Sequence, residues 1–331
     1  MKILIPFFTV IALILLVAAG VKAAGLELLF GVLIPYAAVA VFAVGIVLRV
    51  VKWARSPVPF RIPTTCGQQK SLPWIRQNKI ENPSSTLGVV ARMALEVLFF
   101  RSLFRNVKAD LRNDGNTLAY GSDKWLWLAG LAFHWSFLIV LLRHFRFFAA
   151  HVPFPVRMIE GLDSFLQIGA PLLYLTDLIL LGAVAYLFLR RVALPLVRSI
   201  SLPADYFPLF LIFSIAGTGV LMRYFTKVDV VGVKQLAMGL VSFRPVVPEG
   251  IGTLFYIHLF LVSVLFAYFP FSKLVHMAGV FLSPTRNMVN NSRMVRHVNP
   301  WNYPVHVHTY EEYENDFRDK MKMAGIPVEK E

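Results

Sequence analysis

Residues 253–276 read TLFYIHLFLVSVLFAYFPFSKLVH, and this stretch decides the fold. It contains no acidic residue and a single lysine, so it is apolar enough and long enough to cross a bilayer, which takes about 20 such residues. It also carries His258 and His276, and an ionisable side chain at membrane depth is costly and usually functional. The stretch therefore predicts a membrane helix that holds functional histidines.

The rest of the chain has the same character. Of its 331 residues, 57% are apolar, 14% aromatic and 16% charged, whereas a soluble domain has about 25% charged residues. This excludes soluble, disordered, fibrous and disulfide-stapled classes. We expect an all-α fold, a polytopic transmembrane helix bundle of about six spans, at residues 3–21, 26–50, 125–148, 165–189, 206–225 and 253–275. The first is expected to be a retained helix, because its apolar run exceeds the core of about 7–15 residues found in signal peptides.

The net charge of +14 is explained by topology, and no nucleic acid partner is expected. Lysines and arginines gather in residues 51–124, 190–198 and the tail after 284, and such residues accumulate on the cytoplasmic side. Six spans place all these segments on one side, so we expect a protein of the cytoplasmic membrane with both termini cytoplasmic. The expected parts are an N-terminal hairpin, a cytoplasmic or interfacial connection, a four-helix core and a cytoplasmic tail, at 1–50, 51–124, 125–283 and 284–331.

Two helices are predicted outside the membrane. Residues 87–107 carry Arg92, Arg101 and Arg105 at near-helical spacing, which favours an interfacial helix with its arginines toward lipid phosphates. A seventh span there would break the charge rule. In the tail, Thr309-x-x-Glu312 is a capping box and predicts a docking helix over 309–324.

Four histidines fall inside predicted spans, His134 and His144 in the third, His258 and His276 in the sixth. If the two helices are antiparallel, His144 lies level with His258, and His134 with His276. Two facing imidazole pairs at two depths are what two bis-histidine haem b groups require. The rise between the two histidines differs by about 12 Å between the helices, so tilt or a kink near Pro270 must absorb the difference.

Other residues suit accessory roles. Arg143 and Arg146 flank His144, where haem propionates would end, and Asp177 is placed near the middle of the fourth span as a proton carrier. The single cysteine, Cys66, excludes a c-type haem, a disulfide framework and an iron–sulfur cluster held by this chain alone. His306-x-His308 in the tail favours solvated chain over a metal site.

The residues around the histidines resemble a known family. Phe133-His134, the histidine ten residues later, and the run FPFSKLVH that ends at His276 resemble the cytochrome b (gamma) subunit of respiratory nitrate reductase over residues 125–296. The extra hairpin, the Pro-rich insertion and the acidic tail look more like the membrane M subunit of the sulfite-reduction-associated Dsr MKJOP complex.

This resemblance implies two haem b groups, ligated by His144 with His258 (outer) and by His134 with His276 (inner). It also implies exchange of electrons with menaquinol and menaquinone, and a cytoplasmic iron–sulfur partner similar to heterodisulfide reductase within a membrane redox complex of sulfur metabolism. The family's outer-loop lysine is missing, and Glu160 and Asp163 are the candidates for the quinol site, together with Asp177.

Two alternatives remain open from the sequence. A secondary transporter or proton channel would use the same histidines and Asp177, although no pair of broken, repeat-related helices marks a substrate site. A pure membrane anchor would leave the histidines without a role.

Overall fold

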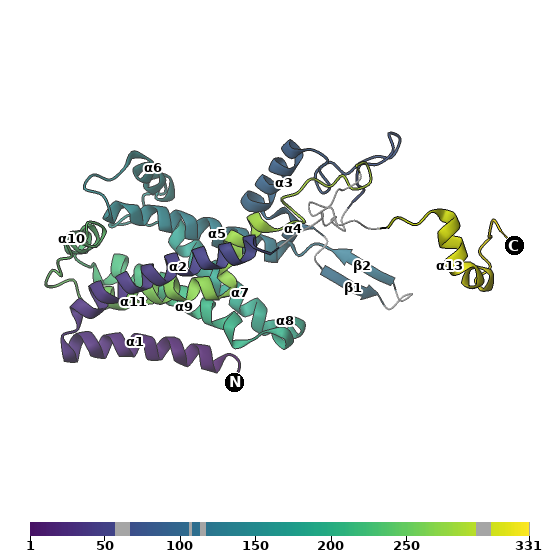
Figure 1. Ribbon diagram of the computed structural model, residues 1–331. Coiled ribbons are helices and arrows are strands. Elements are labelled where there is room, and N and C mark those ends of the chain that lie inside the picture. The colour runs from purple at the N-terminus through teal and green to yellow at the C-terminus, as the bar shows by residue number, and fades with distance from the viewer. Residues whose placement is uncertain (57–66, 106–107, 113–116, 296–305, 331) are drawn as a thin grey trace.

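The computed structural model describes residues 1–56, 67–105, 108–112, 117–295 and 306–330. Six long helices lie side by side and alternate in direction along the chain (Figure 1). They are α1 Leu4–Ala24, α2 Ile34–Ala54, α5 Lys124–His144, α7 Leu175–Ala193, α9 Pro203–Val220 and α11 Thr253–Tyr268. The all-α, polytopic bundle predicted from composition is confirmed.

Shorter elements cap the two ends of this bundle (Figure 1). One end carries α6 Phe154–Asp163 and α10 Val230–Val241. The opposite end carries both chain termini and α3 Thr86–Phe99, α4 Arg101–Phe104, strands β1 Lys108–Arg112 and β2 Thr117–Gly121, and α8 Pro195–Ile200. We call these the α6 end and the α3 end.

Five of the long helices are apolar enough and long enough to span a membrane, which is one fewer than predicted. Together with short π or 3-10 extensions they cover Leu4–Ala24, Leu29–Ala54, Lys124–Phe147, Pro203–Thr226 and Thr253–Phe271. The remaining helix, α7, carries Asp177 in its first turn and Arg190 and Arg191 in its last. Its 19 residues extend about 28 Å, so it matches its neighbours in length but has charges at both ends.

The fourth predicted span begins in the wrong place. Residues 165–174 were expected to be helical, but α7 starts only at Leu175. Gly169 has a positive φ of 77° and Pro171 lacks the N–H that a helix interior needs, so helix does not form there. Asp177 consequently lies in the first turn of α7, at the α6 end, and its predicted position near mid-membrane is wrong.

The sixth predicted span is not one continuous helix. The α-helix α11 ends at Tyr268, and 3-10 turns at Phe269–Phe271 and Lys273–Val275 follow before His276 opens the short α12, His276–Gly279. Pro270 lies in the first of these turns, where its missing N–H stops the helical ladder. This break changes the rise between His258 and His276 relative to a straight helix. Such a change was expected from the sequence, because the two histidine pairs cannot both be level on straight helices.

The core is built around α11, which packs on α1, α2 and α9, while α7 lies between α5 and α9. Leu261 of α11 and Leu211 of α9 are fully buried. Within the described residues, α5 and α11 are not a closely packed pair of helices. Contact between α5 and α11 therefore depends mainly on long side chains that extend from each helix.

The connection before α5 is anchored to that helix. Trp127 and Trp135 of α5 donate their indole N–H groups to the last carbonyls of α3, Phe99 O at 2.7 Å and Leu98 O at 3.0 Å. A helix was predicted over residues 87–107, and α3 confirms its first part. The helix ends at Phe99, because Phe100 has a positive φ of 50°, and the antiparallel β1–β2 hairpin was not predicted.

The arginines of this segment, which were predicted to face lipid phosphates, have partners within the protein instead. Arg92 is buried and donates to Thr285 O at 3.0 Å, whereas Arg101 and Arg105 both pair with Glu81, at 3.0 and 2.9 Å. These contacts bind the connection to the start of the tail and to its own loop.

The predicted tail helix is present as α13, Tyr310–Met323. Its capping box is formed, because Thr309 N donates to Glu312 at 2.9 Å and Glu312 N donates to Thr309 Oγ1 at 3.3 Å. The buried Glu314 carboxylate then accepts the backbone N–H groups of Glu329 and Lys330, at 2.7 and 2.9 Å, which folds the last described residues back onto α13.

Candidate functional site

The four histidines of the predicted spans meet in two pairs. The ring centres of His144 and His258 are 6.3 Å apart and the ring planes differ by only 9°. The ring centres of His134 and His276 are 5.9 Å apart and the planes differ by 85°. Each pair takes one imidazole from α5 and one from the chain segment of α11 and α12. The pairs therefore connect two segments that do not otherwise pack closely.

The hydrogen bonds of three rings fix which nitrogen is free. Nδ1 of His134 lies 2.7 Å from Gly130 O, Nδ1 of His144 2.7 Å from Val140 O, and Nδ1 of His276 2.8 Å from Lys273 O. A carbonyl oxygen only accepts, so Nδ1 carries the proton and Nε2 keeps its lone pair. A metal-binding histidine is oriented in this way by a hydrogen bond from its other ring nitrogen.

The fourth ring reaches the same state through a hydroxyl group. Nδ1 of His258 lies 2.9 Å from Thr218 Oγ1 on α9. That hydroxyl also lies 2.8 Å from Ser214 O and 2.9 Å from Ile215 O, so its own proton goes to a helix carbonyl. Thr218 must then accept the Nδ1 proton of His258, which leaves Nε2 as the free nitrogen of this ring as well.

The pair separations suit a shared metal ion. An imidazole nitrogen binds a transition metal at about 2 Å, so two rings on opposite sides of one ion have centres about 6 Å apart. Each pair offers two nitrogens, and among the described residues no carboxylate or thiolate comes close enough to either pair to complete a cluster of three ligand atoms, whereas zinc sites need three or four protein ligands. Two axial imidazoles alone fit a haem iron, whose other ligands come from the porphyrin.

The surroundings of the pairs are aromatic. Phe100 and Phe133 each place a ring 4.9 Å from that of His134, edge to face, and Phe147 lies 5.9 Å from His144. These side chains give the imidazoles apolar neighbours that suit the flat, apolar face of a porphyrin.

A network of charges lies beside His144 at the α6 end. The guanidinium of Arg143 is buried, with 7% of the residue exposed, and it pairs with Asp163 of α6 at 3.1 Å and with Asp177 of α7. Arg146 pairs with Glu160 at 2.9 Å. The three acidic residues predicted for the quinol site, on α6 and α7, are thus gathered next to a predicted haem ligand.

Aromatic and hydroxyl groups complete this network, and the sequence did not single them out. Tyr224 donates to Asp177 Oδ2 at 3.0 Å, and Thr176 donates to Asp163 Oδ2 at 2.6 Å. Arg143 and Arg223 each lie over the ring of Tyr174, 3.8 and 3.9 Å from its centre. Tyr224 and Arg223 come from the π-helical turn Leu221–Thr226 after α9, a local irregularity that no periodicity predicts.

Arg143 and Arg146 were predicted to meet haem propionates. In the structure both guanidinium groups already have carboxylate partners, and propionate binding by these arginines stays a prediction. Cys66, for which no role was predicted, lies outside the described residues.

Comparison with known proteins agrees with the geometry. Residues 86–298 match the nitrate reductase gamma subunit family. The chain belongs to this family. Two archaeal proteins, each named "Hdr-like menaquinol oxidoreductase cytochrome b-like subunit", are similar over most of their length. The protein from Archaeoglobus fulgidus is 45% identical over 280 residues, 82% of this chain and 83% of its own. The protein from Archaeoglobus profundus is 44% identical over 275 residues, 81% of each chain.

The predicted resemblance to the gamma subunit family is therefore confirmed. Together with the five apolar helices it makes the chain a multi-pass membrane protein of the cytochrome b type.

Proposed function

We propose that the chain is the cytochrome b subunit of a membrane menaquinol oxidoreductase and that it holds two haem b groups. The proposal rests on the two histidine pairs, whose ring centres lie 6.3 and 5.9 Å apart. In all four rings Nδ1 is hydrogen-bonded, so Nε2 is free to bind a metal. The names of the two archaeal relatives support the same reaction.

The histidines orient the cofactors. His144 and His258 would hold one haem through Nε2, and His134 and His276 would hold the other. Haem b supplies reversible one-electron transfer at its iron, and the protein sets the potential through axial ligands, their hydrogen bonds and burial. The ten residues between His134 and His144 advance about 15 Å along α5, which separates the two ligand pairs in depth.

Menaquinol is bound at the α6 end, beside the His144 pair. Its oxidation releases two electrons and two protons, and the protons need acceptors. Asp177 holds a proton at a carboxylate oxygen and exchanges it with Tyr224, whose hydroxyl lies 3.0 Å away. Arg143 compensates the negative charge of Asp177 and Asp163 while they are ionised. Glu160 is held by Arg146, and its side chain is more exposed than that of Asp163, 16% against 3%.

The two ends of the bundle have different partners. The α3 end carries the basic connection and both termini, so it faces the cytoplasm and docks an iron–sulfur subunit similar to heterodisulfide reductase, in the respiratory metabolism of sulfur compounds. The α6 end faces outward across the cytoplasmic membrane. The His144 pair lies toward the proposed menaquinol site and the His134 pair toward the cytoplasmic partner, so bound haems would supply electron transfer inward, while protons leave outward. A transporter is not favoured, since Asp177 is paired with Arg143 at a helix end.

The test is axial-ligand replacement in membranes that contain the whole complex. His258→Ala is expected to remove one of two haems per chain and to slow menaquinol oxidation by about 100-fold or more, while His151→Ala, an exposed histidine at the α6 end, changes neither. His258→Met keeps an axial ligand and is expected to retain both haems, one with a higher potential. Unchanged haem content in His258→Ala, or an unchanged potential in His258→Met, would overturn the proposal.

A further inference from the structure

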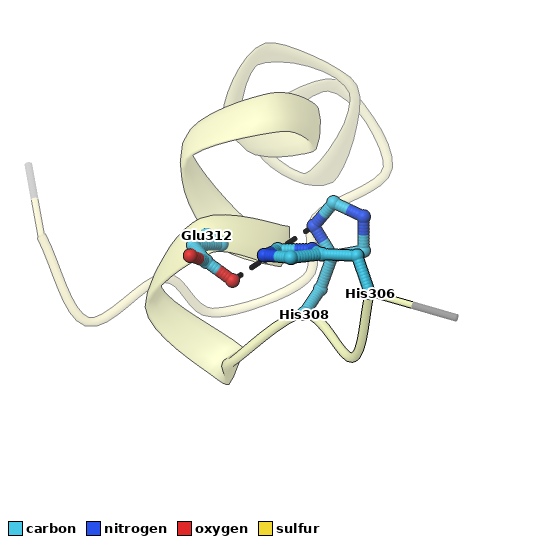
Figure 2. Close-up of side chains that lie close together, drawn as sticks. All are labelled: His306, His308 and Glu312. Carbon is cyan, nitrogen blue, oxygen red and sulfur yellow. Dashed lines mark ion pairs between the residues drawn. The ribbon is translucent and has the colours of Figure 1, made fainter. Parts of the chain in front are cut away.

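The tail contains a second cluster of ligating side chains, far from the membrane histidines in sequence. His306 and His308 precede α13, and Glu312 lies in its first turn (Figure 2). One ligand atom from each of the three lies within 4.8 Å of the others. His308 Nδ1 is 3.9 Å from Glu312 Oε2, and the centres of the two imidazole rings are 4.8 Å apart. All three side chains are exposed, so an ion can reach them from solvent.

The helix cap holds this arrangement in place. Glu312 is the third residue of α13, and Oε2 accepts the backbone N–H of Thr309 at 2.9 Å. The carboxylate is thereby directed back toward the residues that precede the helix, where the two histidines lie. Asp316, one turn further along α13, lies 4.0 Å from His308 Nδ1 and offers an oxygen as the fourth ligand. The same local structure that starts α13 therefore assembles the cluster.

The donor set selects the kind of ion. Two imidazole nitrogens with one or two carboxylate oxygens suit zinc and similar divalent transition metals, which accept mixed nitrogen and oxygen ligands in tetrahedral geometry. Calcium and magnesium prefer oxygen ligands alone. Glu312 and Asp316 also make this side of α13 acidic, which attracts a cation, whereas Glu311 is paired with Lys330.

We propose that His306, His308 and Glu312, completed by Asp316 or water, bind one divalent transition-metal ion of the zinc class. The ion links the chain before Thr309 to the first two turns of α13. This helix has only 14 residues, and helices of fewer than about 12–15 residues are marginal by themselves. Binding therefore stabilises the tail helix and fixes the direction in which the chain enters it. The site is independent of the haem ligands and of the menaquinol reaction.

The test uses the full-length, haem-loaded chain in detergent, purified through a tag without histidine, freed of metal by dialysis and titrated with Zn²⁺. We expect one equivalent per chain that binds in the micromolar range or tighter, and we expect it to be lost in the double variant His306→Gln/His308→Gln. The variant Glu312→Gln separates the metal ligand from the helix cap, because Gln also completes a capping box but has no carboxylate. It should keep α13 and weaken Zn²⁺ binding by about 10-fold or more.

His151→Gln should leave the titration unchanged, and haem content should be equal in all variants. Zn²⁺ should also slow amide hydrogen exchange in the first turns of α13 in the wild type but not in the double variant. The proposal is overturned if the wild type binds no Zn²⁺, or if the double variant binds the same equivalent with the same affinity.

Discussion

Thr218 is the residue whose replacement tests the ligand geometry most finely. Its hydroxyl accepts the Nδ1 proton of His258 at 2.9 Å, while its own proton goes to Ser214 O or Ile215 O. Thr218→Val keeps the side-chain shape but removes this acceptor. The ring N–H of His258 is then left without its partner, and the imidazole becomes a weaker electron donor to the haem iron that we propose it ligates.

The size of the effect follows from that one hydrogen bond. A typical net contribution is about 1 kcal/mol, which corresponds to about 40 mV for a one-electron couple at 59 mV per factor of ten. Loss of the partner makes His258 donate less charge, so the oxidised iron is less stabilised and the midpoint potential rises. A redox titration followed at the haem absorption bands should show one of two potentials raised by about 40 mV, with the other unchanged.

Thr218→Ser is the matched control, because serine restores the hydroxyl and should restore the wild-type potential. Both variants should keep two haems per chain, so that the potential is read on intact protein. Identical potentials for wild type and Thr218→Val, with full haem content, would refute the assignment of His258 as a ligand oriented by Thr218.

Three further predictions follow from other contacts. The variant Asp177→Asn leaves Arg143 with one carboxylate in place of two and removes a proton acceptor. Menaquinol oxidation should therefore slow by about 100-fold, while both haems remain bound. Full activity in this variant would exclude the proposed role of Asp177 in proton transfer. The ring planes differ by 9° in the His144–His258 pair and by 85° in the His134–His276 pair. Electron paramagnetic resonance of the oxidised protein should therefore show a rhombic low-spin signal for the first pair and a strongly anisotropic signal for the second. Two signals of the same kind would contradict the ring geometry. The backbone N–H groups of Glu329 and Lys330 hold the pKa of Glu314 below its ordinary value. The stability that this carboxylate gives to the tail is therefore present at neutral pH and is lost as the pH falls through the lowered pKa. In that pH range, amide exchange at residues 329 and 330 should rise beyond its intrinsic pH dependence. The variant Glu314→Gln should lack this transition.

Much of the bundle was accessible from the sequence because long apolar runs leave few alternatives in a bilayer. The pairing of His144 with His258 and of His134 with His276 was expected from the antiparallel order of two spans, and the structure places these rings next to each other. The start of α7 was missed, because the apolar residues before Leu175 continue the hydropathy signal although Gly169 and Pro171 prevent helix.

The details of the site depend on contacts that span long sequence separations. Thr218 is 40 residues from His258, and Tyr224 is 47 residues from Asp177. Neither spacing has a periodic signature, and both depend on how α9 packs against α11 and α7. The break at Pro270 was suggested by the unequal rise between the histidines, but only the coordinates show that α11 stops at Tyr268 and that His276 belongs to a separate short helix.

The central claim is that two histidine pairs each hold one haem. Its most direct test is the haem b content of the purified wild-type chain, measured as the pyridine haemochrome against protein determined by amino-acid analysis, together with the visible spectrum after reduction. The account predicts two haems b per chain and a reduced spectrum of the b type. A fully folded, colourless preparation, or a single haem in a chain with all four histidines intact, would contradict it.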